Sequence, residues 1–157
     1  MKPMGGFTLI EMMIVIAIIG VLVSVAAPFA QIAEQRNREN DLRRALRELR
    51  QGIDAYKQAV DEGRVQRATQ DSGYPKTLDV LVDGVEDLKS PNRKKIYFMR
   101  RIPRDPMDLN QLLAPAQTWE TRSYASPPEE PKEGDDVFDI HSKSTRLGMN
   151  QIPYKAW

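Results

Sequence analysis

The chain has 157 residues, which allows one compact domain beside a long helix and is too short for two full cores. Its 23 Lys and Arg residues against 22 Asp and Glu give a formal net charge of +1, so overall charge does not favour a nucleic acid or another polyanion as the partner. Cysteine is absent, which excludes disulfide bonds and thiolate chemistry.

Residues 1–6 (MKPMGG) form a short leader with one positive charge, Lys2, directly before a long apolar run. An ordinary secretory signal is cut after its apolar region, whereas the small-residue site at Gly6 lies before that region. Cleavage after Gly6 would therefore leave the hydrophobic helix on the mature protein.

The apolar run is long enough to cross a membrane. No residue from Met12 to Ala30 is charged, and with Phe7 to Ile10 the run exceeds the roughly 20 residues that a transmembrane helix needs. The alternative, a buried core helix that is apolar on every face, would need a much larger protein around it. We therefore expect a membrane-spanning helix over residues 7–30. Pro28 lacks an N–H group and is expected to kink or loosen it.

Glu11 is a lone carboxylate inside this apolar stretch. Placing an Asp at the bilayer centre costs roughly 2.5 to 3.5 kcal/mol on insertion scales, so the charge favours a partner of opposite sign. If the chain is cut after Gly6, the new amino group of Phe7 lies about one helical turn away, and a neighbouring subunit could present the same group. The alternative is a residue that snorkels to the membrane interface without a function.

Residues 6–11 (GFTLIE), followed by the apolar run and Pro28, resemble the N-terminal signal of type IV pilins and type II secretion pseudopilins. The resemblance implies that a prepilin peptidase cuts after Gly6 and methylates the new N-terminal Phe7. It also implies that Glu11 helps each incoming subunit to dock on a growing fibre whose core is formed by the helix over 7–30. The implied location is the inner membrane, with a single pass and a periplasmic soluble domain, and then a periplasmic fibre.

The helix is expected to continue beyond Pro28 to about Asp61, and its second half, residues 31–62, is amphipathic. Apolar residues recur there at alternating steps of three and four: Leu42, Leu46, Leu49, Ile53, Tyr56 and Val60. Because this stripe is short, it predicts the seat of a soluble domain rather than an isolated coiled coil. Gly63 is expected to end the helix as its C-cap.

Residues 63–157 are expected to form loops, a short helix and a small antiparallel sheet, which gives an α+β fold. Thr77 is a good N-cap for a helix over 78–82. The aromatic and β-branched content of 119–126 and 137–142 predicts two strands joined by a proline-rich acidic loop.

Two further segments of the soluble region leave alternatives open. Residues 152–157 supply either a third strand or a packed aromatic tail, and residues 96–99 are too few to classify.

The soluble region resembles the major pseudopilins of type II secretion systems in the order of several short motifs: Tyr74-Pro75, Arg101-Ile102-Pro103, Asp105-Pro106, Trp119 and residues 136–140 (DVFDI). The resemblance implies a homopolymer that works with minor pseudopilins, the prepilin peptidase and an inner-membrane assembly platform. Type IVa pilins usually close a C-terminal loop with a disulfide, so the lack of cysteine favours the pseudopilin branch. The alternatives are a minor pilin of a type IV pilus or DNA-uptake fibre, and a single-span periplasmic binding module that keeps its leader.

Major pseudopilins, by this resemblance, fold a C-terminal loop around calcium, but this chain departs from that pattern. Beyond Asp139 it has no carboxylate side chain and several cations: Lys143, Arg146 and Lys155. Calcium favours several oxygen ligands with net negative charge. The weak candidate ligands are three aspartates: Asp135, Asp136 and Asp139. We therefore expect no resident cofactor, with packing of Tyr154 and Trp157 in place of the metal, and calcium bound by these aspartates is the alternative.

A catalytic function is not indicated by the sequence. His141 is the only histidine, and no serine elbow, phosphate loop or metal-spaced cluster occurs. In a strand, His141 is more often a surface or packed residue than a base. We expect a structural protein and not an enzyme.

A basic cluster, Arg100, Arg101 and Arg104, lies in the soluble region. Its simplest interpretation is a solvated rim. The sharper hypothesis is a contact with an acidic surface on an adjacent subunit.

Overall fold

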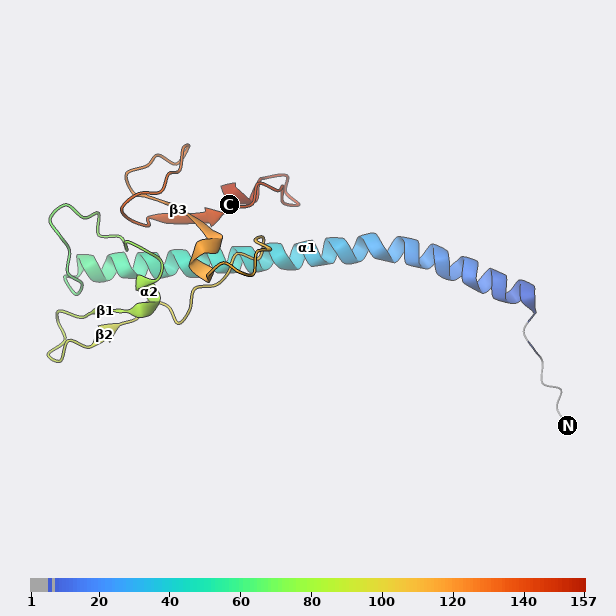
Figure 1. Ribbon diagram of the computed structural model, residues 1–157, viewed down its shortest axis with the longest axis horizontal. Coiled ribbons are helices and arrows are strands. Elements are labelled where there is room, and N and C mark those ends of the chain that lie inside the picture. The colour runs from blue at the N-terminus through green and yellow to red at the C-terminus, as the bar shows by residue number, and fades with distance from the viewer. Residues whose placement is uncertain (1–5, 7) are drawn as a thin grey trace. The chain divides into compact units, whose positions relative to one another are not determined.

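The computed structural model describes residue 6 and residues 8–157 (Figure 1). The chain divides into two compact units, Met1–Asn37 and Arg38–Trp157. One long N-terminal helix, α1 (Leu9–Asp61), is followed by short helices and short antiparallel strands. The predicted α+β fold is confirmed.

In the first unit, α1 begins at Leu9, two residues after the predicted start, and runs through Pro28 without interruption. Proline has no N–H group to donate to the carbonyl four residues before it, here that of Ser24. The kink at Pro28 stays a prediction.

The apolar stripe predicted on the second half of α1 is confirmed. Leu42 and Leu49 are fully buried, and Tyr56 packs against the core from a partly exposed position. The rest of the main core comes from the segments that follow the helix: Leu78, Leu81, Met99, Met107, Trp119, Val137, Ile140 and Tyr154. Burying each large apolar side chain contributes about 1.5 to 3 kcal/mol, so this stripe holds the second unit together.

Gly63 ends α1 as predicted, with a left-handed φ of 68°. The N–H of Gly63 donates to the carbonyl of Val60 at 2.9 Å, and the N–H of Arg64 donates to the carbonyl of Ala59 at 2.9 Å. This pair of bonds is the Schellman motif, which glycine forms without the steric cost that other residues meet.

The short helix α2 (Val80–Asp83) begins two residues later than predicted, and the predicted N-cap Thr77 is wrong. Leu78 is buried in the core, and its carbonyl accepts a hydrogen bond from the N–H of Leu81 in a turn. Asp79 therefore takes the N-cap position, without a capping bond from its side chain.

Beyond α2, the strands β1 (Val85–Glu86) and β2 (Lys95–Ile96) pair antiparallel, with Val85 opposite Ile96. The sequence left this region unclassified, and two-residue strands are too short for a periodic pattern to reveal. In Figure 1 this pair and the β3–β4 pair lie on different sides of the second half of α1.

The strands β3 (Trp119–Arg122) and β4 (Asp139–Ser142) pair antiparallel, with Trp119 opposite Ser142. A 3-10 turn, η1 (Pro115–Thr118), leads into β3. Both strands are shorter than predicted, because the chain leaves the ladder at Ser123, whose hydroxyl donates to the carboxylate of Asp136.

The tail of the chain forms a 3-10 turn, η2 (Tyr154–Ala156), rather than a third strand. The rings of Tyr154 and Trp157 meet edge to face with their centroids 5.1 Å apart. The packed aromatic tail is therefore the correct one of the two predicted alternatives.

Candidate functional site

The candidate site is the start of α1, where the sequence placed Gly6, Phe7 and Glu11. Gly6 is exposed and precedes the helix, with open space where a side chain would lie. Phe7 lies outside the described residues. Glu11 is exposed in the first helical turn.

Thr8 caps this helix, a role that the sequence analysis missed. The hydroxyl oxygen of Thr8 accepts a hydrogen bond from the N–H of Glu11 at 3.3 Å, and its carbonyl accepts one from the N–H of Met12 at 3.2 Å. The signal was present as a Thr-x-x-Glu pattern before an apolar run, which is typical of a helix N-terminus. A carboxylate in the first turn also interacts favourably with the helix dipole, by roughly 0.3 to 1 kcal/mol at an exposed position.

The surface behind Glu11 is apolar and exposed in the first unit. Its large apolar side chains that are described as exposed include the following: Leu9, Ile10, Met12, Met13, Ile14, Val15, Ile16, Ile18, Ile19, Val21, Leu22, Val23, Phe29 and Ile32. Soluble monomers rarely expose a continuous apolar surface of this size, so it needs lipid or other apolar helices around it. In the described part of the chain, α1 is the one helix whose length and composition would allow it to cross a membrane.

The three aspartates proposed as weak metal ligands have different surroundings. Asp135 is exposed, whereas Asp139 is held by Arg50 at 2.8 Å and by Arg122 at 3.6 Å. Among the described residues, no group of three or more His, Cys, Asp or Glu side chains is arranged to hold a metal ion.

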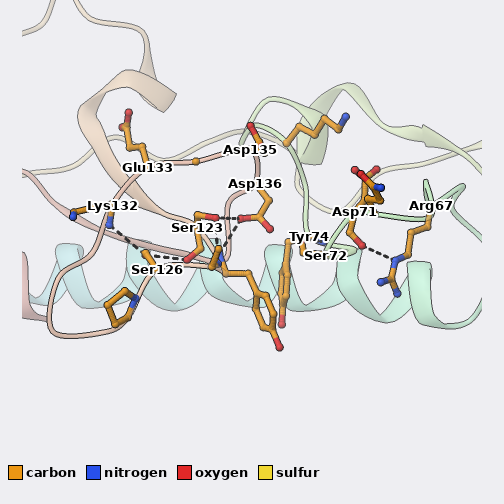
Figure 2. Close-up of a pocket in the computed structure, with 16 residues that line it drawn as sticks. Arg67, Asp71, Ser72, Tyr74, Ser123, Ser126, Lys132, Glu133, Asp135 and Asp136 are labelled. Atoms are coloured by element: carbon orange, nitrogen blue, oxygen red, sulfur yellow. Dashed lines mark hydrogen bonds between the residues drawn. The ribbon is translucent and has the colours of Figure 1, made fainter.

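Asp136 lies in an open groove of about 690 Å³, drawn in Figure 2. Its carboxylate accepts hydrogen bonds from the hydroxyl of Ser123 at 2.7 Å and from the N–H of Tyr124 at 2.9 Å. Burial raises the pKa of Asp136, but the hydrogen bonds from Ser72, Ser123 and Tyr124 outweigh burial and hold that pKa below its ordinary value. The carboxylate thus organises the turn after β3.

The other residues considered in the sequence have structural surroundings. His141 is partly buried on β4, opposite Glu120, with its Nδ1 3.8 Å from that carboxylate. The guanidinium of Arg104 donates to the carbonyls of Leu113 at 2.6 Å and Asn110 at 2.8 Å, which ties it to its own loop.

Arg100 and Arg101, by contrast, are exposed. Their exposure is compatible with both interpretations of the basic cluster, a solvated rim and a contact with a neighbouring subunit.

The N-terminal segment also matches a known sequence pattern. Residues 1–27 match the prokaryotic N-terminal methylation motif, a stretch that contains Gly6, Phe7 and Glu11. The type II secretion system core protein G of Klebsiella pneumoniae is 30% identical over 143 residues, which cover 87% of this chain and 94% of that protein. This chain belongs to the type II secretion system core protein G family.

A second core protein G agrees with this assignment to the major pseudopilins, and a fimbrial protein is also similar to the chain. The core protein G of Aeromonas hydrophila is 30% identical over 121 residues, covering 74% of this pseudopilin and 77% of the relative. A fimbrial protein of Moraxella nonliquefaciens is 36% identical over 101 residues, covering 54% of this pseudopilin and 66% of the relative. No solved structure matches the chain. The matches to core protein G are longer than the match to the fimbrial protein, at 143 and 121 residues against 101.

Proposed function

We propose that this pseudopilin is the structural subunit of a periplasmic pseudopilus, which polymerises through its N-terminal helix to drive type II protein secretion. The observation that carries the proposal is the exposed apolar surface of α1 with Glu11 in its first turn. In the precursor the apolar first half of α1 is a single inner-membrane span, and the soluble unit is periplasmic. After assembly the same half of the helix lies in the core of the fibre.

Leader removal prepares the helix for assembly. A prepilin peptidase cuts after Gly6 and methylates Phe7, and the new amino group then lies about one helical turn from Glu11. Within a subunit this cation lies at the positive end of the helix dipole, where it is unfavourable. A carboxylate at position 11, of the same chain or of a neighbour, offsets that cost.

Glu11 recruits the next subunit in this proposal. A carboxylate in hydrocarbon costs roughly 2.5 to 3.5 kcal/mol on the insertion scale for Asp, and pairing with the amino group of an adjacent chain recovers part of that cost. Because a pair between two chains forms only when their helices are correctly aligned, it sets the register of the fibre core.

Transfer of the apolar helix from lipid to fibre exchanges one apolar environment for another. Hydrocarbon and a bundle of identical apolar helices solvate these side chains similarly, so the net free energy is small. An inner-membrane assembly platform can then drive the exchange. Minor pseudopilins complete the fibre, and the protein itself is a substrate of the peptidase rather than an enzyme.

A second candidate is a minor pilin of a type IV pilus or DNA-uptake fibre, which the match to a fimbrial protein favours. The genes beside this one distinguish the two functions. A secretin and a type II inner-membrane platform without a retraction ATPase support secretion, whereas a retraction ATPase supports a pilus.

Two experiments test the proposed function. Mass spectrometry of the protein purified from its membranes should find an N-methylated Phe7 as the first residue, and a protein that retains Met1 would refute the fibre assignment. Glu11→Gln should insert normally in the membrane and fail to form fibres in electron micrographs. The matched control is Glu48→Gln, which removes an exposed carboxylate from the second unit and should assemble normally. Normal fibres from Glu11→Gln would refute the role of this residue.

A further inference from the structure

Residues 144–157 fold into a loop that rests on the second half of α1. The N–H of Tyr154 donates to the carbonyl of Arg146 at 3.0 Å, and a β-bridge joins Leu147 to Pro153. These backbone contacts are internal to the loop. Its position on the domain must therefore come from other contacts, which have to offset the entropy lost when the loop is ordered.

Arg50 of α1 provides the first of these contacts. Its Nε donates to the carboxylate of Asp139 at 2.8 Å, and its Nη2 donates to the main-chain oxygens of Ile140 at 3.2 Å and Trp157 at 3.0 Å. One planar guanidinium thus joins the helix, β4 and the far end of the loop. Arginine suits this position because its donors are held in a fixed geometry.

Glu39 provides the second contact, three helical turns earlier. Its Oε1 accepts hydrogen bonds from the N–H of Met149 at 2.8 Å and from the hydroxyl of Tyr154 at 3.0 Å. Glu39 is 5% exposed, so these bonds are shielded from water. Between the two, the guanidinium of Arg43 lies over the ring of Trp157, 4.5 Å from its centroid.

The resemblance to major pseudopilins implies calcium in this region, but the residues present do not fit that ion. Calcium takes about six to eight oxygen ligands and favours several carboxylates. Asp139 is already neutralised by Arg50 and Arg122, and no carboxylate side chain follows it in the sequence. A calcium ion near Asp139 would have to displace two guanidinium groups, and their positive charge would oppose it.

We propose that Glu39 and Arg50, a charged clamp on one helix, hold the 144–157 loop in the role that the resemblance assigns to calcium, so that the folded unit does not depend on calcium. The carboxylate of Glu39 lies where the loop offers hydrogen-bond donors, and the guanidinium of Arg50 lies where the loop offers an acceptor. The fixing charges are therefore covalently part of the chain and are not lost to a chelator. This proposal concerns the second unit alone and does not depend on fibre assembly.

The test is hydrogen exchange of the full-length chain in detergent micelles, measured by mass spectrometry over residues 144–157. Wild type is compared in calcium and in EDTA, beside Arg50→Met and the control Arg44→Met, which alters an arginine of the same helix whose side chain is 73% exposed. Wild-type exchange should be the same in both buffers. Hydrogen bonds to charged groups are strong enough that Arg50→Met should raise exchange of the loop by roughly tenfold or more, and Arg44→Met should not.

Two results would overturn the clamp. One is exchange of the wild-type loop that is slower in calcium than in EDTA. The other is exchange of the loop that is unchanged in Arg50→Met. If Arg50→Met does not fold, Tyr154→Phe takes its place, because it removes only the hydroxyl that bonds Glu39. Exchange of the loop around Met149 should then rise and stay raised in calcium. No rise, or recovery with calcium, would refute the proposal.

Discussion

Gly52 is a site where helix propensity and packing have opposite effects on stability. It lies in the interior of α1, where alanine is favoured over glycine by roughly 0.8 to 1.0 kcal/mol. A Cβ atom at this position, however, would lie 2.8 Å from both the Cγ and the Sδ of Met99. Met99 is buried, and its backbone N–H is bonded to the carbonyl of Leu81 at 3.0 Å. The backbone of Met99 is therefore held in place, so its side chain would have to leave its packed rotamer to admit the Cβ atom.

The packing cost should exceed the gain in helix propensity. Overpacking a well-filled core typically costs roughly 1 to 3 kcal/mol, so Gly52→Ala should destabilise the second unit by about 1 kcal/mol after the helix gain is subtracted. In a Met99→Ala background the obstruction is gone, and the same Gly52→Ala change should stabilise by up to about 1 kcal/mol. The sign of the effect therefore depends on Met99.

Urea unfolding of the full-length chain in detergent, followed by circular dichroism and tryptophan fluorescence, measures these differences. Ala55→Gly, at an exposed position one turn away, is the control for helix propensity and should destabilise by roughly 0.8 to 1.0 kcal/mol. A Gly52→Ala variant that is more stable than wild type would refute the packing argument. An effect of equal sign in both backgrounds would refute the role of Met99.

Three further substitutions test the fold by the same unfolding measurement. Gly63→Ala should cost roughly 1 to 2 kcal/mol, because Gly63 has a left-handed φ of 68°, and a neutral result would contradict the Schellman assignment. Trp119→Phe removes the Nε1 donor from the carbonyl of Pro103, 2.8 Å away, and should cost roughly 1 to 3 kcal/mol, whereas no loss would mean that water replaces the indole. Burial raises the pKa of Asp105 above its ordinary value of 3.8, despite opposing hydrogen bonds from Ser142 and Met107. The folded state therefore binds the proton more tightly than the unfolded state, and Asp105 lowers the free energy of unfolding as the pH rises above 3.8. Asp105→Asn removes that titration, so its stability relative to wild type should increase between pH 4 and pH 7, and a pH-independent difference would contradict the raised pKa.

The sequence predicted the long helix and its stripe well, because a 3.6-residue period reports burial directly. The burial of Leu42 and Leu49 could be predicted without knowing which segments cover them. Gly63 was equally clear, since a glycine after the last apolar position of a helix has few other interpretations. These features depend on local physics.

Strand ends and long-range contacts could not be predicted in this way. The end of β3 depends on Asp136, which reaches back across 13 residues to Ser123. Arg50 meets Trp157 from 107 residues away, and in sequence it is one of several arginines on the same helix. A periodic pattern contains no information on which of these arginines the tail will meet.

The start of α1 combines local and long-range requirements in one short motif. Thr8 and Glu11 begin the helix by capping it, a purely local effect that operates with or without the leader. The proposed partner of Glu11 exists only after cleavage, because an uncut peptide bond before Phe7 carries no charge. Methylation of the new amino group leaves its positive charge in place. Under the proposed function, cleavage would therefore change the ability of the helix to assemble without changing its fold, and the precursor would already hold this helix fully formed in the membrane.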